Sequence, residues 1–321
     1  MIPVVDGHVD LISFLKHNFP MMPFSDVTRG EITLKQLAKG HVRVLVSAFY
    51  CPDCENGPGT STAFLSSLIT YFQQYLDDLP ILNSPKHLNR VMVGSGSPAL
   101  ILLLQNADAL LEWDFLDLWC RGFRTIGLTH RGTNRIGDGN RVRNPNGLSF
   151  KGKQLAQKLS ESGFIIDVNY LSEPAFDQVV RSSSGALIAS HSGLRRFCDI
   201  PQNLSDEQIR IIIERGGIIG VTFVKEMLSS SRQAGIYELF AQIDWLVQQY
   251  GPDQVAVGSD FGTNKEKCNG LENPAQFQRL AEILKEHGYS QKAIAKIMGK
   301  NWSEFYALHL DRNRFLEWPH Q

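Results

Sequence analysis

The chain contains 321 residues, of which 43% are hydrophobic, 10% aromatic and 20% charged, and its formal net charge at pH 7 is -1. This composition is typical of a soluble globular protein and excludes a disordered, collagenous or coiled-coil chain. Because 32 basic residues balance 33 acidic ones without a basic block, bulk charge is not expected to bind nucleic acid or an anionic membrane. No segment approaches the roughly 18 consecutive apolar residues of a membrane span.

The ends of the chain and its cysteines predict a cytoplasmic protein. The N-terminal MIPVVDGHVD has neither the basic start nor the apolar stretch of a secretory signal, and the C-terminal LEWPHQ has no lipidation motif. Five cysteines in a chain of this size are not typical of a disulfide framework. We therefore expect reduced thiols and no membrane partner.

Short β-branched runs alternate with longer helical patterns along the chain. Eight candidate strands lie at residues 2–6, 42–50, 100–105, 125–129, 164–168, 186–191, 218–223 and 255–260. Continuous apolar runs such as GFIID and GGIIGVTF are typical of parallel strands buried on both faces. Between the strands, SFKGKQLAQKLSESG predicts a helix ending at Gly163, and NLSDEQIRIIIERGG predicts one with Ser205 as N-cap and Gly216 as C-cap.

This alternation predicts an α/β fold, a (β/α)8 barrel of the TIM type, with a doubly wound sheet as the alternative. No segment has the composition of an interdomain linker, and the clusters CPDCENGPG and RNPNG are typical of loops. We therefore expect a single domain over residues 1–321. Trp302 in KNWSEF is expected to pack within the closing helix.

Polar residues at the ends of the predicted strands are candidates for a common site, because such barrels carry their active sites there. In chain order these residues are His8, Asp10, Gln105, His130, Asp167, Tyr170, His191 and Asp260. Alternate residues of a strand point the same way, so His8 and Asp10 can reach one metal ion. Each residue alone also fits a structural role, such as capping, but their joint placement favours one metal-dependent site.

The blocks around these residues resemble the membrane (renal) dipeptidase family of zinc hydrolases, which share an amidohydrolase-type barrel. The resemblance covers about residues 5–306 and includes DGHVD, NADAL, GFRTIGLTHRGTN, GFIIDVNYLSE, LIASHSGLRRFCD, NLSDEQIRIIIERGGIIGVTF, VGSDFG, NGLEN and GKNWSEF. It implies a two-zinc centre that cleaves dipeptides, many with a D-residue on the C-terminal side.

The resemblance also implies roles for five residues. His8 and Asp10 match the family's first two zinc ligands, and His191 matches its last histidine ligand. His130 matches a histidine that contacts the substrate and stabilises the transition state. Asp260 matches the aspartate that handles the proton of the attacking water.

Three positions depart from the family pattern. Gln105 in LLQNADAL stands at the bridging glutamate, Tyr170 in DVNY at a histidine ligand, and Gln202 in IPQN at the arginine for the substrate carboxylate. A neutral glutamine cannot bridge two cations, and tyrosine ligates only as a phenolate, against an unperturbed pKa of about 10. The metal position that Gln105 and Tyr170 would serve keeps only His191 as a conventional ligand. This position is predicted to bind a metal ion weakly or not at all.

The other metal position keeps His8 and Asp10 and can recruit Asp260. Three protein ligands and an open fourth position are the usual plan of a catalytic zinc site, so one zinc ion is expected. If Asp260 serves as a ligand, His191 is the predicted base, and His130 polarises the carbonyl or stabilises the oxyanion.

Loss of the arginine at Gln202 removes a charge-assisted anchor for a free carboxylate. Candidate substitutes lie in the loops after the fourth and sixth strands and are Arg131, Arg135, Arg141, Arg143, Arg195 and Arg196. Ordinary surface ion pairs are the alternative for each. The predicted substrate site includes His130, Gln202 and Arg195. Cys51 and Cys54 form a lone CxxC and are interpreted as two loop thiols, ahead of a redox or metal role.

Three hypotheses of function follow. The first is a dipeptidase-like metallohydrolase that cleaves a dipeptide or similar small amide, with no nucleic-acid partner and homodimerisation as an open possibility. The second is a catalytically impaired family member that acts as a small-molecule binding or scaffold protein, because three positions depart together. A third is a hydrolase with the same chemistry that cleaves a different bond in its substrate, for example in a lactam, a lactone or another amide. The retained Asp260 favours the first.

Overall fold

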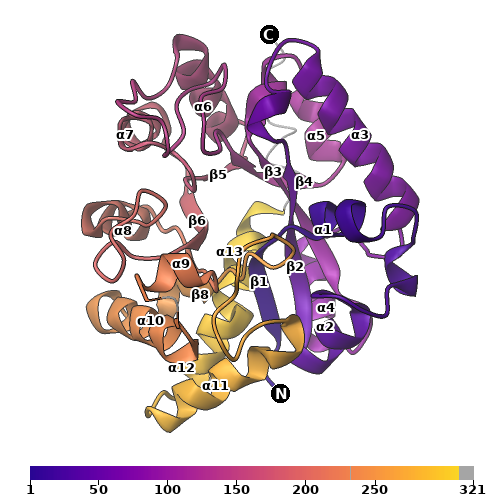
Figure 1. The fold of residues 1–321 in the computed structure, drawn as a ribbon, viewed down its shortest axis with the longest axis vertical. Helices are drawn as coiled ribbons and strands as arrows, with labels where there is room; N and C mark the ends of the chain where they lie inside the picture. Colours follow the sequence, from indigo (N-terminus) through magenta and orange to yellow (C-terminus); the bar gives the residue numbers. More distant parts are fainter. Residues whose placement is uncertain (232, 311–321) are drawn as a thin grey trace.

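Eight parallel strands form a nearly closed barrel in the computed structural model, which describes residues 1–231 and 233–310 (Figure 1). In order around the sheet they are β1 (Val4–Val9), β2 (Val42–Tyr50), β3 (Ala99–Gln105), β4 (Phe123–Gly127), β5 (Ile165–Asp167), β6 (Leu187–Ser192), β7 (Ile219–Val221) and β8 (Val255–Val257). A parallel bridge between Val9 and Phe261 joins the segment after β8 to β1. The predicted (β/α)8 barrel is confirmed; residues 311–321 of the expected domain lie outside the described residues.

Helices surround the strands and cover their outer face (Figure 1). They are α1 (Leu11–Asn18), α2 (Leu34–Gly40), α3 (Thr60–Tyr75), α4 (Pro85–Val93), α5 (Phe115–Cys120), α6 (Phe150–Glu161), α7 (Glu173–Ser182), α8 (Asp206–Glu214), α9 (Lys225–Leu228), α10 (Ile236–Tyr250), α11 (Phe277–Glu286), α12 (Gln291–Ala295) and α13 (Asn301–His309). Ser205 caps α8 and Gln208 completes a reciprocal capping box. Gly163 and Gly216 have positive φ just beyond α6 and α8, as their sequences predict.

The closing helix α13 seals the end of the barrel at which the strands begin. Trp302 and Tyr306 are fully buried there and belong to one apolar cluster with Val44, Ala99 and Ile165, which lie within the first three residues of their strands. The Trp302 indole donates a hydrogen bond to the carbonyl of Val257 at 2.9 Å. A tightly packed floor of this kind leaves the opposite, carboxyl end of the barrel for polar residues.

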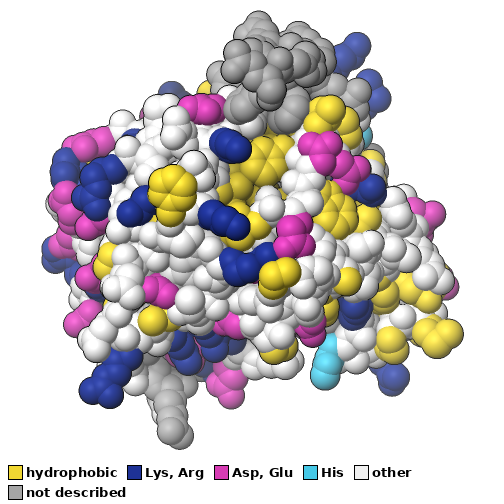
Figure 2. Space-filling model, turned by 90° about the horizontal axis from the view of Figure 1, so that it is seen from above, with side chains coloured by type: hydrophobic (Ala, Val, Ile, Leu, Met, Phe, Trp, Pro, Cys, Tyr) yellow, Lys and Arg dark blue, Asp and Glu magenta, His cyan; other side chains and the backbone are white. Residues whose placement is uncertain are grey.

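The surface agrees with the balanced composition. Seen from the top of Figure 1, basic and acidic side chains are interspersed across the face (Figure 2). Among residues 1–231 and 233–310, no helix is both long and apolar enough to cross a membrane.

Candidate metal centre

A cavity of about 860 Å³ opens at the carboxyl end of the barrel. Five of the polar residues predicted from strand ends line it: Asp10, Gln105, His130, Tyr170 and Asp260. His8 and His191 are fully buried, and their rings lie 3.7 Å apart. The structure therefore brings these seven residues to one end of the barrel.

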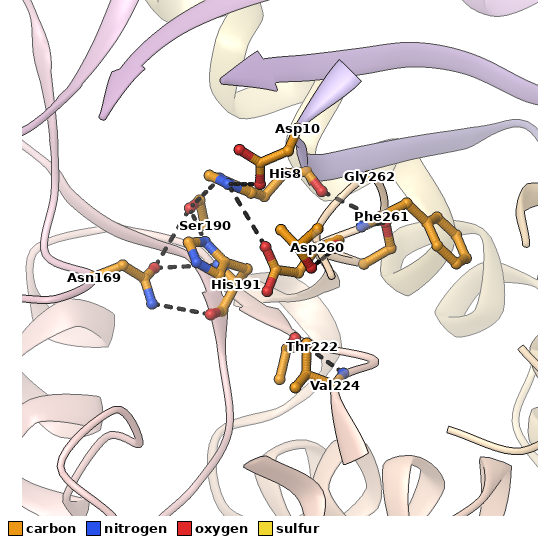
Figure 3. A network of polar contacts seen from close by, with 12 residues as sticks. His8, Asp10, Asn169, Ser190, His191, Thr222, Val224, Asp260, Phe261 and Gly262 are labelled. Carbon is orange, nitrogen blue, oxygen red and sulfur yellow. Dashed lines mark hydrogen bonds and ion pairs between the residues drawn. The ribbon is translucent and has the colours of Figure 1, made fainter. Parts of the chain in front are cut away.

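His8, Asp10 and Asp260 form a compact set of possible metal ligands (Figure 3). His8 Nε2 lies 3.3 Å from Asp10 Oδ2 and 4.0 Å from Asp260 Oδ1, and one ligand atom from each residue lies within 4.8 Å of the others. This nitrogen is buried and has no hydrogen-bond partner among the described residues. Buried polar atoms normally have a partner, so an unsatisfied imidazole nitrogen beside two carboxylates fits a divalent cation.

The backbone explains how Asp260 reaches this position. Asp260 follows the end of β8 by three residues and adopts a left-handed conformation, with φ of 59°. Its backbone N–H donates to the carbonyl of His8 at 3.1 Å, which ties the segment after β8 to β1. His8 itself lies inside β1, whereas the sequence placed the strand end before it.

The Ser190 hydroxyl lies next to the rings of His8 and His191 (Figure 3) and also contacts the Asp167 carboxylate. It donates to Asp167 Oδ2 at 2.6 Å and lies 2.8 Å from His191 Nδ1 and 3.2 Å from His8 Nδ1. Partners of this kind fix the orientation of metal-binding histidines. Asn169 exchanges two hydrogen bonds with the backbone of His191, which holds that residue in place. Asp167 therefore supports the histidines from behind the cavity.

Lys265 is a member of the site that the sequence analysis missed. Its ammonium lies 2.8 Å from Asp260 Oδ2 and 3.0 Å from the Tyr170 hydroxyl. Burial alone would lower the pKa of Lys265, but the Asp260 carboxylate outweighs it and raises the pKa above its ordinary value. Conversely, burial would raise the pKa of Asp260, but the positive charge of Lys265 outweighs it and lowers the pKa. The pair is therefore fully ionised.

The donor set at the second metal position does not fit a divalent ion. Gln105 is uncharged, and burial raises the pKa of the Tyr170 phenol despite the nearby Lys265. The Tyr170 hydroxyl lies 3.4 Å from His191 Nε2 and accepts the hydrogen bond from Lys265. One imidazole, a neutral phenol and an amide offer no negative charge to a second cation.

His130 is held at the cavity wall by Tyr50, the last residue of β2, and by Asp53 from the segment that follows. Its Nδ1 lies 3.2 Å from the Tyr50 hydroxyl and 3.6 Å from Asp53 Oδ2. Burial lowers the pKa of His130 and the Asp53 carboxylate only partly offsets this, so the ring is neutral near pH 7. Asp53 is fixed in turn by the backbone N–H of Gly132 at 2.8 Å. Asp53 belongs to the CPDC segment, where the cysteines alone had been considered.

The predicted substrate-binding pair Gln202 and Arg195 does not line the main cavity. Arg195 forms an ion pair with Glu173 beside a separate cavity of about 490 Å³. When its amide oxygen faces Arg141, Gln202 accepts hydrogen bonds from that guanidinium at 2.6 and 2.8 Å. Both residues are thus engaged away from His8, and their role in substrate binding stays a prediction.

Of the six candidate arginines, Arg131 is the one that lines the main cavity. Its Nε atom is buried and has no hydrogen-bond partner among the residues that the structure describes. A guanidinium with unused donors can bind a carboxylate in a charge-assisted manner. Arg196 and Arg135 form ion pairs elsewhere, with Asp206 in the first case and with Asp108 and Glu112 in the second.

The cysteines allow a direct chemical test of the structure. Cys54 and Cys120 are exposed, whereas Cys51, Cys198 and Cys268 are buried, and all five are free. Burial raises the pKa of Cys51 and of Cys268 to about 12, so their thiolates are scarce near neutrality. With a chromogenic disulfide reagent at pH 7.5, we expect two thiols to react rapidly and five after unfolding. One rapid thiol, and three in total after unfolding without reductant, would instead indicate a Cys51–Cys54 disulfide.

Comparisons with known proteins agree with this fold. The chain is 30% identical over 199 residues to an uncharacterised protein in the pqqA 5' region of Klebsiella pneumoniae, covering 59% of this chain and 73% of that one. It is 23% identical to dipeptidase verJ of Clonostachys rogersoniana, covering 94% and 82% of the two chains. A metallopeptidase from Rhodobacter sphaeroides, solved with a phosphinate mimic of the dipeptide L-Ala-D-Ala, superposes with a TM-score of 0.84 at 21% identity, over 97% of this chain and 99% of that one.

The family comparison covers almost all of the described chain. Residues 1–304 match the model of the membrane dipeptidase family, peptidase family M19. This range contains both β1 and the segment after β8, and so every residue of the candidate site. The chain therefore belongs to the membrane dipeptidase family and is a hydrolase of the dipeptidase type.

Proposed function

We propose that the protein hydrolyses a dipeptide or a similar small amide with one zinc ion bound by His8, Asp10 and Asp260. The observation that carries the proposal is the buried Nε2 of His8, which has no well-aligned hydrogen bond and lies 3.3 Å from Asp10 Oδ2 and 4.0 Å from Asp260 Oδ1. Three such ligands leave a coordination position open, as catalytic zinc sites do. The dipeptidase name of one relative and the dipeptide mimic in the Rhodobacter structure support a dipeptide substrate.

The residues around the ligands have complementary roles in this reaction. A bound divalent ion would acidify water to supply a nucleophile near neutral pH. Asp260 is ionised and hydrogen-bonded to Lys265, so it serves better as a ligand than as a proton acceptor. Burial, and next the charge of His8, lower the pKa of His191 well below its usual value, so a neutral ring is present to accept a proton.

Substrate binding is assigned to the cavity wall. The neutral His130 ring, held by Tyr50 and Asp53, can hydrogen-bond the carbonyl oxygen as negative charge develops on it. Arg131, with its unused guanidinium nitrogen, can bind the free carboxylate of the substrate. A cavity of about 860 Å³ has ample room for a dipeptide.

Hydrolysis of a dipeptide panel tests the proposal directly. The panel contains L-Ala-D-Ala and its L,L isomer, and release of free amino acid is followed with metal-loaded protein. We expect turnover that a chelator abolishes and added zinc restores. A metal-loaded protein that binds these dipeptides but releases no amino acid from any of them would instead support the catalytically impaired binding protein.

Replacing Asp53 by asparagine tests how His130 is positioned. The change keeps the side-chain shape but removes the negative charge near His130 Nδ1, so we expect kcat to fall about tenfold, equivalent to ~1.4 kcal/mol of transition-state stabilisation. Zinc content should be unchanged, because Asp53 is not among the proposed ligands. The control is Glu55→Gln in the same short 3-10 turn. Equal effects of the two variants on kcat would contradict the assignment.

Zinc binding should depend on pH through His8. Burial alone would lower the pKa of His8, but the Asp10 carboxylate and the neighbouring acidic residues raise it above 6.5. Zinc binds the neutral ring, so below this raised pKa each ion displaces a proton, and the apparent affinity falls up to about tenfold per pH unit. Calorimetry in buffers of different ionisation enthalpy should detect proton release at pH 6. An apparent heat independent of the buffer at that pH would contradict the prediction.

A further inference from the structure

We propose that the Lys265 ammonium takes the place of a second metal ion in this centre. It lies beside Asp260, Tyr170 and His191, and its positive charge limits the centre to one metal ion. The inference rests on the proposed function, because it assumes that His8, Asp10 and Asp260 bind one divalent ion. It adds a role for a lysine that no strand-end pattern indicates.

The two oxygens of Asp260 face different partners. Oδ2 lies 2.8 Å from the Lys265 ammonium, and Oδ1 lies 4.0 Å from His8 Nε2, on the side of the proposed metal ligands. One carboxylate can therefore serve a metal ion with one oxygen and an ammonium with the other. In a carboxylate that bridges two metal ions, each oxygen likewise binds a different cation.

The Lys265 ammonium also lies close to Tyr170 and His191, two residues of the second metal position. It is 3.0 Å from the Tyr170 hydroxyl, which lies 3.4 Å from His191 Nε2. His191 is the remaining imidazole that could serve a second ion. A cation within hydrogen-bond distance of Tyr170 therefore opposes metal binding at that imidazole.

The loop after β8 holds Lys265 in this position. The backbone carbonyl of Lys265 accepts a hydrogen bond from the Lys267 ammonium at 2.8 Å, which also binds the Thr263 hydroxyl at 3.1 Å. Lys267 forms an ion pair with Glu31, whose carboxylate accepts a hydrogen bond from Gly262. The Lys265 side chain is 16% exposed, so it is a largely buried component of the cavity wall.

The charges facing the cavity are consistent with one metal ion. Asp10 and Asp260 are the two carboxylates of the ligand set that line the cavity, and together they offset one divalent ion. The Lys265 ammonium then leaves a single positive charge, which one hydroxide nucleophile neutralises. A second divalent ion would add two positive charges, and neither Gln105 nor the neutral Tyr170 supplies a carboxylate to offset them.

Zinc titrations of variants of the full chain test the proposal. Lys265→Met removes a cation next to Asp260, so we expect zinc to bind at least tenfold more tightly, whereas Lys265→Arg keeps the charge and the wild-type affinity. The matched control is Lys16→Met, which makes the same charge change at another lysine of the cavity wall. Equal zinc affinity in Lys265→Met, Lys16→Met and the wild type would overturn the proposal.

Restoring the missing ligands gives a second, independent test. The double variant Gln105→Glu/Tyr170→His is expected to bind one zinc ion while Lys265 is present, and two once Lys265→Met is added. Two ions bound with Lys265 retained would overturn the proposal even if the Lys265→Met proteins fail to fold, which thermal unfolding in chelator would reveal.

The same titrations separate this inference from the proposed function. A wild-type chain that binds no zinc contradicts the proposed metal centre, whatever Lys265 does. In that case zinc binding by Lys265→Met would still support the role of the lysine, and no binding would overturn both. One ion in the wild type with unchanged affinity in Lys265→Met would overturn only the role of Lys265.

Discussion

Replacing Asp10 by alanine is expected to abolish both metal binding and hydrolysis. Asp10 Oδ2 lies 3.3 Å from His8 Nε2, so the change removes one of three proposed ligands and half of the negative charge facing the ion. We expect kcat/KM to fall by about 10⁴ or more, equivalent to roughly 5.5 kcal/mol of transition-state stabilisation. Amino acid release from dipeptides and zinc content per chain are measured on the same preparation.

The control for this variant is Asp77→Ala, which removes an exposed carboxylate outside the cavity. It should retain wild-type activity and metal content. Full activity in Asp10→Ala would contradict the metal-dependent mechanism. Full metal content with lost activity would show that Asp10 acts on the substrate and is not a ligand.

Replacing Trp302 by alanine is expected to have the largest effect on stability. The ring is fully buried beneath the barrel, so close to Gly7 that a Cβ there would be 2.6 Å from it. Removing the ring leaves a cavity and leaves the carbonyl of Val257 without its hydrogen-bond donor. We therefore expect the free energy of unfolding to fall by about 3–5 kcal/mol.

Guanidinium-induced unfolding in the presence of chelator measures this loss without the contribution of bound metal. The matched control is Leu308→Ala in the same helix, whose side chain is 66% exposed. It should change the free energy of unfolding by less than about 0.5 kcal/mol. Equal destabilisation by both variants would contradict the role assigned to Trp302.

The barrel could be predicted because its strands are apolar on both faces. All six residues of β1 and all seven of β3 are buried, which produces the continuous apolar runs visible in the sequence. The boundaries were less accurate. The predicted strands at 218–223 and 255–260 are six residues long, but β7 and β8 each contain only three, because the chain leaves the sheet while it is still buried.

The candidate site could be located because strand ends converge, but its loop residues could not. His8 and Asp10 come from the end of β1, and a left-handed turn just after β8 brings Asp260 to them. Lys265 and Asp53 reach the cavity from the loops after β8 and β2. The path of a loop depends on tertiary contacts, and no periodic pattern of residues in the sequence predicts it.

Arg195 illustrates the opposite error. It follows β6 as the sequence suggested, but its guanidinium forms an ion pair with Glu173 and also donates to the carbonyl of Asn203. Those local partners direct it to the smaller cavity beside α7. Position after a strand end therefore placed the residue at the correct end of the barrel without determining the direction of its side chain.

Metal content per chain tests the central claim most directly. Untagged protein is purified without chelator, saturated with zinc and freed of excess metal, and zinc is measured by elemental analysis in the wild type and in Asp10→Ala. We predict one zinc ion per wild-type chain and none in the variant. A wild-type chain that holds no zinc, or one that holds two ions, would contradict a single-ion centre bound by His8, Asp10 and Asp260.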